Sequence, residues 1–332
     1  MHPVSTTTLI DAFGRRFPYL RLSVLDACNF RCSYCLPNGY RAKEGRSRYL
    51  EHDEIQRLIS AFASLGMRKL RISGGEPSLR RDLPAIIGAA SSVTGVESVA
   101  LTTNGATLHR HLDRWLDNGL TGLNVSVDAL CAERFERITG HAGLPDLLAG
   151  LDRALRSALA SVKINAVLLR DLNDDQLPAW LDYLRERDIT VRFIELMQTG
   201  DSLDYFQRHH YRADVLERDL IEQGWTLLER AADAGPAREY QHPQYRGRIG
   251  VIAPYSKDFC AGCNRLRVTA TGDLRLCLFG DAGIPLRPLL QDDAQQDELR
   301  AMLVRQLGLK QASHGLHLGN TGLIQNFASI GG

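Results

Sequence analysis

The chain has 332 residues, of which 44% are hydrophobic and 24% are charged. This composition lies in the ordinary globular range and excludes disordered and fibrous classes. No apolar run approaches the ~20 residues that span a bilayer, and the N-terminal sequence lacks the apolar stretch of a secretory signal, so we expect a cytoplasmic protein. The net charge of +1 excludes a general electrostatic attraction to nucleic acid or to an anionic membrane.

Short apolar runs between residues 20 and 195 predict six β-strands. They recur about every 34 residues, which is the size of a βαβ unit. Their Val, Ile and Leu content on both faces is typical of parallel strands covered by helices. The predicted strands are Leu20–Leu25, Lys69–Ser73, Ser98–Thr102, Gly122–Val127, Val162–Leu168 and Thr190–Glu195. Helical patterns lie between them near residues 52–65, 82–92, 107–118, 145–160 and 174–187.

Six such units favour an α/β fold with an open, partial TIM-type (β/α)6 barrel over residues 1–200, since a closed barrel needs eight. The regular alternation of predicted strands and helices ends after Glu195. We expect residues 201–332 to form a smaller C-terminal α+β segment that covers the mouth of the barrel. Its predicted helices lie near residues 213–223 and 292–307, and its predicted strands near 248–252, 266–270 and 273–277.

Six of the seven cysteines fall in two tight groups of three. Disulfides within such groups would leave odd thiols, and bunched cysteines in a long chain without a secretory signal favour a metal site. The groups are Cys28, Cys32 and Cys35, and Cys260, Cys263 and Cys277.

The first group, Cys28-x3-Cys32-x2-Cys35, follows the first predicted strand directly, where the loops of α/β folds build active sites. Three thiolates can hold an iron–sulfur cluster and leave one of its iron atoms open to an outside ligand. A structural zinc site would need a fourth ligand close by, and the nearest histidine, His52, lies 17 residues beyond Cys35.

The second group, Cys260-x2-Cys263-x13-Cys277, again offers three ligands without a fourth beside them. Taken alone, it is compatible with a Cys3His zinc site that borrows His242 or His314. Beside a first open cluster, it could instead bind a second open cluster that holds a substrate.

The sequence CNFRCSYC at 28–35, followed by GGEP at 74–77, resembles the radical S-adenosylmethionine enzymes. The resemblance implies that the first three cysteines bind a [4Fe–4S] cluster, whose fourth iron chelates S-adenosylmethionine. One electron then yields a 5′-deoxyadenosyl radical. The positions that match cofactor contacts are Tyr34, Gly75, Ser126 and Met197.

The segment FCAGCNRLRVTATGDLRLCLF at 259–279 narrows the resemblance to the GTP 3′,8-cyclases of molybdenum cofactor biosynthesis. The resemblance runs from Phe13 to the terminal Gly331–Gly332. It implies that the second cysteine group binds another [4Fe–4S] cluster, whose open iron binds the guanine of GTP. The radical would remove the ribose 3′ hydrogen, and the new carbon radical would attack guanine carbon 8 to give 3′,8-cyclo-7,8-dihydro-GTP.

Basic residues on several strands match the GTP contacts of this family. Guanidinium and ammonium groups suit a triphosphate because their hydrogen bonds to phosphate are charge-assisted and often bidentate. The matching positions are Arg21, Arg71, Thr102, Lys163, Arg265, Leu266 and Arg267. The resemblance assigns catalytic roles to Arg265, Arg267 and the glycine tail Gly331–Gly332, which would enter the active site.

The resemblance also implies a flavodoxin-like or equivalent one-electron donor and a functional link to cyclic pyranopterin monophosphate synthase. It leaves the oligomeric state open between monomer and homodimer. One alternative is a radical peptide- or sulfatase-maturing enzyme with an auxiliary cluster, and a second is a non-catalytic zinc-binding module. The three C-terminal cysteines, the pair Arg265 and Arg267, and the diglycine end favour the cyclase.

Overall fold

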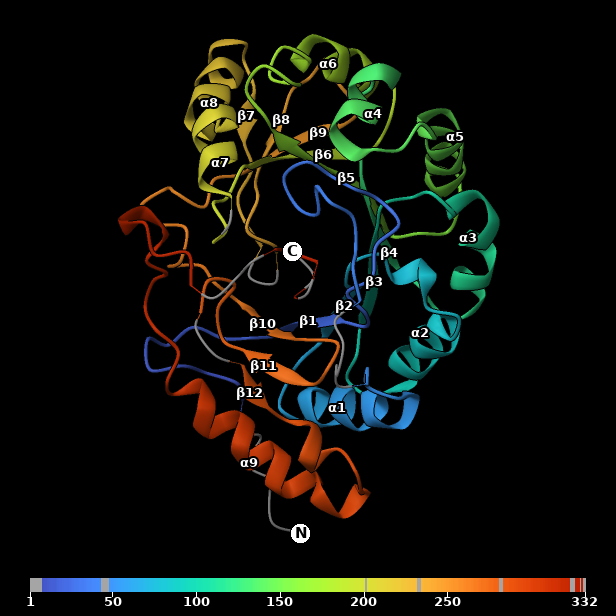
Figure 1. Cartoon of the computed structure of the whole chain (residues 1–332), viewed down its shortest axis with the longest axis vertical. Coiled ribbons are helices and arrows are strands. Elements are labelled where there is room, and N and C mark those ends of the chain that lie inside the picture. The colour runs from blue at the N-terminus through green and yellow to red at the C-terminus, as the bar shows by residue number, and fades with distance from the viewer. Residues whose placement is uncertain are drawn as a thin grey trace.

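The computed structural model describes residues 8–42, 48–200, 202–231, 234–280, 283–322, 326–328 and 330. Within them, one twelve-stranded sheet curves around a central space, with helices outside the curve (Figure 1). The strands follow the order β12-β11-β10-β1-β2-β3-β4-β5-β6-β9-β8-β7. Their bounds are β1 Tyr19–Ser23, β2 Lys69–Ser73, β3 Ser98–Thr103, β4 Gly122–Ser126, β5 Ser161–Leu168, β6 Thr190–Glu195, β7 Thr226–Leu227, β8 Arg238–Gln241, β9 Arg248–Ile252, β10 Arg265–Val268, β11 Asp273–Arg275 and β12 Ile284–Pro285.

The central strands from β10 through β1–β6 to β9 are all parallel, and the short outer strands are antiparallel to their neighbours. In the described part of the chain no pairing joins the outermost strands β12 and β7, so the sheet is an open, partial barrel. The sequence predicted the six strands β1–β6. It did not predict that β9 and β10, from the C-terminal part, would extend the same sheet at both edges.

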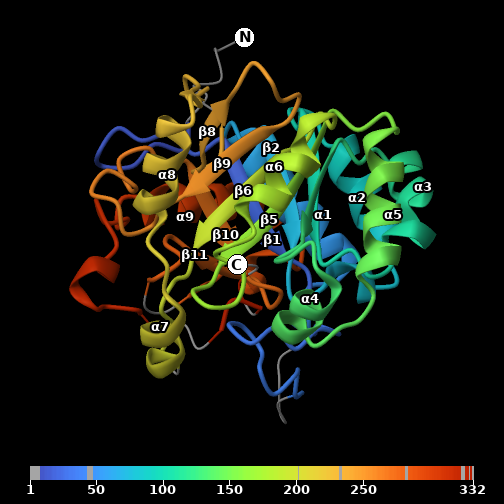
Figure 2. The same ribbon diagram turned by 90° about the horizontal axis from the view of Figure 1, so that it is seen from above.

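Helices connect the parallel strands along the outer face of the sheet (Figure 1). In the view from above, α2, α3 and α5 lie on one side of the molecule and α8 and α9 on the other (Figure 2). The α-helices are α1 His52–Ser64, α2 Leu83–Ser92, α3 Leu108–Asp117, α4 Ala132–Thr139, α5 Leu144–Leu155, α6 Leu177–Arg185, α7 Leu203–His209, α8 Ala213–Glu222 and α9 Gln296–Leu307. The sequence did not predict α7, which has only seven residues. None of the described helices is long and apolar enough to cross a membrane.

The strands alternate between two kinds of environment, which corrects the expectation of apolar residues on both faces. On β1, Leu20 and Leu22 are fully buried in the core beneath the helices. Tyr19 and Arg21, on the opposite face of that strand, line the central cavity. Side chains alternate across a strand with a period of two, so the same division applies to each parallel strand.

Residues of the C-terminal part, near α9, form hydrogen bonds with helix α1 of the N-terminal half. The carboxylate of Glu54, which is 8% exposed, accepts hydrogen bonds from Arg287 at 2.8 and 3.1 Å and from Gln291 at 2.8 Å. Arg287 begins a short 3₁₀-helix, Arg287–Leu289, in the chain that leads to α9. Helices α1 and α9 also pack against each other. A buried charged side chain thus fixes the position of the last helix.

Replacing Glu54 by alanine should lower the free energy of unfolding by about 2 kcal/mol, because a partly buried guanidinium loses its charged partner. The matched control is Glu51→Ala, which removes an exposed ion pair with Arg48, although Glu51 also takes part in the capping box of α1. Chemical denaturation of both variants would measure the difference. Equal stabilities for the two variants would contradict this account.

Candidate active site

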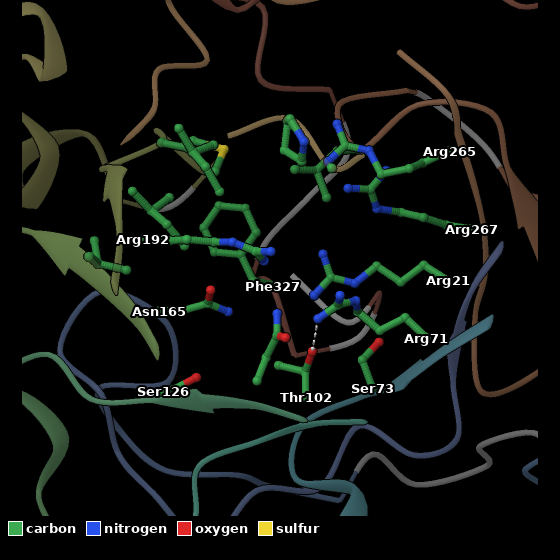
Figure 3. A pocket seen from close by; sticks show the side chains of 18 of the residues that line it. Arg21, Arg71, Ser73, Thr102, Ser126, Asn165, Arg192, Arg265, Arg267 and Phe327 are labelled. Carbon is green, nitrogen blue, oxygen red and sulfur yellow. Dashed lines mark hydrogen bonds between the residues drawn. The ribbon is translucent and has the colours of Figure 1, made fainter. Parts of the chain in front are cut away.

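A cavity of about 480 Å³ lies on the concave side of the sheet, and both cysteine groups line it. The sequence separates these groups by more than 200 residues, yet the fold brings all six thiols to the same cavity. Between the groups, side chains from the parallel strands point into the cavity (Figure 3).

Glu76 of the GGEP sequence holds the first cysteine loop in place. Its fully buried carboxylate accepts hydrogen bonds from Thr103 Oγ1 at 2.7 Å and from the backbone N–H groups of Asn104 at 2.6 Å and Ser78 at 3.0 Å. Asn104 in turn donates to Asn29 Oδ1 at 2.8 Å, beside Cys28. A buried carboxylate therefore joins the loops that follow β1, β2 and β3.

Gly75 is required by the neighbouring backbone. A Cβ atom at this position would lie 2.2 Å from the carbonyl oxygen of Ala27 and 2.4 Å from that of Asp26. The adjacent Glu76 N–H donates to the same Ala27 oxygen at 2.7 Å. Because only glycine allows this approach, Gly75 sets the position of the chain that enters Cys28.

Tyr34, inside the cysteine loop, is anchored by Asp128. Its hydroxyl donates to Asp128 Oδ2 at 2.9 Å, and the other carboxylate oxygen accepts the Val167 N–H at 2.9 Å. Burial raises the pKa of Asp128 to about 6 despite these hydrogen bonds, and it raises the pKa of Tyr34 well above its usual value. Tyr34 is therefore a neutral, oriented ring at the wall of the cavity.

The two cysteine groups differ in their electrostatic surroundings. Burial raises the pKa of all three thiols of the first group, to about 12 for Cys35. In the second group burial also opposes ionisation, but hydrogen bonds from His314 and Ser313 outweigh it and bring the pKa of Cys260 to about 7. Lys310 and Arg265 likewise lower the pKa of Cys263. The first group is thus expected to ionise only when a positive centre binds it.

The fold places one of the two candidate histidines beside the second cysteine group. Among the described residues, which include all six cysteines of the two groups, no three His, Cys, Asp or Glu side chains are grouped around a position for one ion. His314 is buried near Cys260, whereas His242 packs against Trp225 and Tyr245. In an iron–sulfur cluster each thiolate binds a different iron, so three thiols on one cavity wall suit a cluster better than a single ion.

Basic side chains form rows across three adjacent strands. The parallel register aligns Arg267, Arg21 and Arg71 across β10, β1 and β2. These three side chains, with Arg265, enter the cavity from one side, as Figure 3 shows. Two residues earlier on the same strands, Tyr19 lies between Arg265 and Lys69. Neighbours in register on one face of a sheet are close, so the cations must lie side by side.

Further polar groups face this cluster from strands β3, β5 and β6. Thr102 accepts a hydrogen bond from Arg71 at 3.3 Å, and Arg71 also donates to the hydroxyl of Tyr19. Lys163 and Arg192 enter from β5 and β6. Arg192 lies across the cavity from the arginines of β1, β2 and β10 (Figure 3).

The cations of the cavity repel one another. Burial, followed by repulsion from Arg267, lowers the pKa of Arg21 to about 9, and burial with neighbouring arginines lowers the pKa values of Arg192 and Arg267 to about 10. In the described structure, the buried Nε atoms of Arg192, Arg265 and Arg267 have no hydrogen-bond partner. Buried donors of this kind normally have an acceptor, so the cavity is suited to a ligand with several negative oxygens.

The positions expected from the sequence come together in this cavity, with two qualifications. The cysteines, Tyr34, Gly75, Ser126, Met197 and the expected basic residues all line it. Leu266 does not, since its side chain lies on the other face of β10 in the hydrophobic core. Gly331–Gly332 lie outside the described residues, whereas the nearby Phe327 and Ala328 line the cavity.

Several further cavity residues on the same strands were not expected from the sequence. Polar residues alternate with apolar ones along these strands, and this alternation indicates which face of each strand is turned to the cavity. The alternating segments are YLRLS, KLRIS, SVKINAVL and TVRFIE. The missed residues on these strands are Tyr19, Lys69, Asn165 and Arg192. Lys310 carries no such signal because it follows α9, and its ammonium group donates to the carbonyl of Leu276.

Known proteins resemble this chain over nearly its whole length. Residues 22–184 match the radical SAM superfamily, and residues 189–316 match the family described as Molybdenum Cofactor Synthesis C. A GTP 3′,8-cyclase of Stenotrophomonas maltophilia (strain K279a) is 63% identical over 98% of this chain and 99% of its own length. The GTP 3′,8-cyclase of Yersinia pestis is 51% identical over 98% of this chain and 99% of its own length.

The structural comparison supports the fold. The crystal structure of Streptococcus suis SuiB bound to S-adenosylmethionine aligns with a TM-score of 0.61 and 12% sequence identity. The alignment covers 86% of this chain and 68% of that chain. At 12% sequence identity the alignment shows a shared fold only, which is the α/β fold of a partial barrel.

The affinity of the cavity for GTP should fall as the pH rises through about 8. Burial and then repulsion from Arg192 lower the pKa of Lys163 to about 8, so this cation is lost above that pH unless an anion is bound. Arg71 and Arg21 lower the pKa of Tyr19 to about 8 against the effect of burial, so a repelling phenolate forms in the same range. Loss of the Lys163 charge alone should raise the Kd about fivefold between about pH 7.5 and about pH 8.7.

Calorimetric titration at several pH values would measure this dependence. The control is Lys163→Arg, which keeps its charge over the range and should show a smaller rise in Kd. A Kd that does not change with pH in the wild-type protein would contradict the assignment.

Proposed function

Because the chain belongs to the GTP 3′,8-cyclase family of radical S-adenosylmethionine enzymes, we propose that its cavity holds GTP between the two cysteine groups. The protein catalyses the radical S-adenosylmethionine-dependent cyclisation of GTP in molybdenum cofactor biosynthesis, and its cofactors are S-adenosylmethionine and [4Fe–4S] clusters. One observation carries the assignment of the site. Two cysteine groups and a cluster of arginines and lysines line a single cavity.

The first cysteine group forms the radical-generating end of the site. Cys28, Cys32 and Cys35 would hold the first cluster, because the burial that raises the pKa values of these thiols leaves them to ionise when a positive centre binds them. When bound, this cluster and S-adenosylmethionine supply the radical that removes a hydrogen atom from the ribose. The cofactor would contact Tyr34, Gly75, Ser126 and Met197, which line the cavity.

The second cysteine group forms the substrate end of the site. Cys260, Cys263 and Cys277 would hold the second cluster, which would supply a binding site for the guanine of GTP. Arg265 and Arg267 follow directly on β10 and bring buried, unpartnered Nε donors to the cavity. We assign them a catalytic role because they lie between the second cysteine group and the row of cations on β1 and β2.

The remaining cations would fix the triphosphate. Arg21, Arg71 and Lys163, with Thr102, provide donors from four different strands, and Lys69 and Arg192 add to them. Binding from several strands orients the ribose relative to both cysteine groups, which is the main contribution that the protein can make to a radical reaction. A contact of Leu266 with GTP would involve its backbone only, because its side chain lies in the core.

The C-terminal segment, residues 201–332, would close the mouth of the barrel formed by residues 1–200. Phe259, Phe279 and Phe327 from this segment line the cavity. Apolar side chains in the cavity wall would exclude water, which would protect a radical and strengthen the charge interactions inside. Gly331–Gly332 would enter the site as a slender tail beside the arginines.

Family membership also guides the proposed partners. A flavodoxin-like protein or an equivalent reductase would supply single electrons, and cyclic pyranopterin monophosphate synthase would use the product. We propose that the enzyme works in the cytoplasm. The oligomeric state is open between monomer and homodimer.

The decisive experiment is anaerobic incubation of the reconstituted enzyme with S-adenosylmethionine, a reductant and GTP. The expected results are about eight irons per chain and formation of 5′-deoxyadenosine that depends on GTP. Arg71→Met should raise the KM for GTP at least about tenfold, because a buried guanidinium that contacts phosphate is lost. The matched control is Arg68→Met, at an exposed arginine that pairs with Glu97 on the surface. Zinc without iron, or product formation without GTP, would refute the assignment.

Removal of Gly331–Gly332 should abolish cyclisation and leave the fold and both clusters intact. The expected cause is loss of the tail from the site rather than loss of stability, since terminal residues contribute little to folding. Product formation, iron content and thermal unfolding would be measured together. Leu318→Ser, at a side chain that is 80% exposed, serves as a control in the same region. Normal turnover by the truncated enzyme would exclude a role for the tail.

A further inference from the structure

One carboxylate faces the cations of the cavity and pairs with two of them. Glu239, on β8, accepts a hydrogen bond from Lys163 Nζ at 2.8 Å, and its Oε1 atom lies 3.8 Å from Arg192. Two other acidic residues line the cavity, but they are engaged elsewhere: Asp128 with Tyr34 and Glu195 with His210. Among the acidic residues of the described cavity wall, Glu239 is thus the one that pairs with the cations.

The sheet register builds this contact. Arg192 on β6, Gly250 on β9 and Glu239 on β8 lie in one row across three neighbouring strands. A Cβ atom at Gly250 would lie 3.0 Å from Cγ of Arg192. The glycine therefore leaves space for Arg192 to run toward Glu239 over the middle strand.

The pair is partly shielded from water. The side chains of Lys163 and Glu239 are 21% and 24% exposed, and that of Arg192 is 10% exposed. Burial raises the pKa of Glu239, but hydrogen bonding and attraction from Lys163 outweigh it, so the carboxylate stays ionised at neutral pH. Charge pairs in such surroundings are less screened than surface pairs.

We propose that Glu239 is an internal counter-anion that occupies Lys163 and Arg192 in the empty site and must be displaced when the triphosphate of GTP binds. This inference rests on the proposed function, because it requires those two cations to bind phosphate. The displacement lowers the affinity for GTP. It also assists release of the product, which keeps the triphosphate, because the carboxylate can pair again with both cations.

A second arrangement would have the opposite consequence. A carboxylate beside a triphosphate could hold a divalent cation that bridges it to the phosphate oxygens. Loss of the carboxylate would then weaken GTP binding in the presence of Mg²⁺. The existing pairing of Glu239 with two cations favours the counter-anion.

The test is GTP binding to reconstituted, anaerobic enzyme, with Glu239→Gln compared with the wild-type protein with and without Mg²⁺. We expect the Kd for GTP to fall about tenfold and the dissociation rate to slow, because two cations no longer have to leave a competing carboxylate. Glu239→Asp, which keeps the charge, should stay close to the wild type. Glu229→Gln, at an exposed position before β8, controls for the change in net charge.

A double-mutant cycle tests the pairing directly. In a Lys163→Met background, Glu239→Gln should tighten GTP binding much less than it does in the wild type. An unchanged or higher Kd for GTP in Glu239→Gln would overturn the inference and leave the proposed function in place. If the variant binds GTP more weakly than the wild type only when Mg²⁺ is present, Glu239 binds a metal ion instead. Failure of the wild-type protein to bind GTP would instead overturn the proposed function, and this inference with it.

Discussion

Repulsion among the arginines of β10, β1 and β2 is the interaction on which the rest of the site depends. The parallel register aligns Arg267, Arg21 and Arg71 in one row, and burial prevents water from separating their charges. The fold tolerates this arrangement because the opposite faces of the same strands are packed with leucine, isoleucine and valine beneath the helices. The hydrophobic core thus holds together a set of cations that would otherwise move apart, and a polyanion completes it.

The cavity is electrostatically divided between its two ends. The first cysteine group lies near the buried carboxylates Asp128 and Glu76, whereas the second lies near Lys310 and the arginines of β10. A positively charged sulfonium cofactor suits the first end, and an anionic nucleotide suits the second. The charges of the protein therefore favour opposite placements for the two small molecules, which reduces the chance that either binds in the place of the other.

Much of this architecture could be predicted from the sequence, because the βα rhythm and the cysteine spacings are local signals. The strands β1–β6 and most of their connecting helices were expected close to their observed bounds, and the two cysteine groups were expected to bind two separate clusters. The pairing of β10 with β1 could not be predicted, because it joins residues about 246 positions apart. Local patterns in the sequence do not indicate which distant strands pair. For the same reason Glu239 was not identified: only the register through Gly250 brings it to Arg192.

The pairing of β10 with β1 has a consequence for biosynthesis of the protein. During translation, β1 is among the first elements to leave the ribosome, yet its partner on one side is made only after most of the chain. Until then β1 presents an open edge with unpaired backbone groups, and its row of arginines is incomplete. The second cysteine group is synthesised at the same late stage as β10. The residues of the second cysteine group can therefore join the sheet only after the strands that support the first cysteine group have been made.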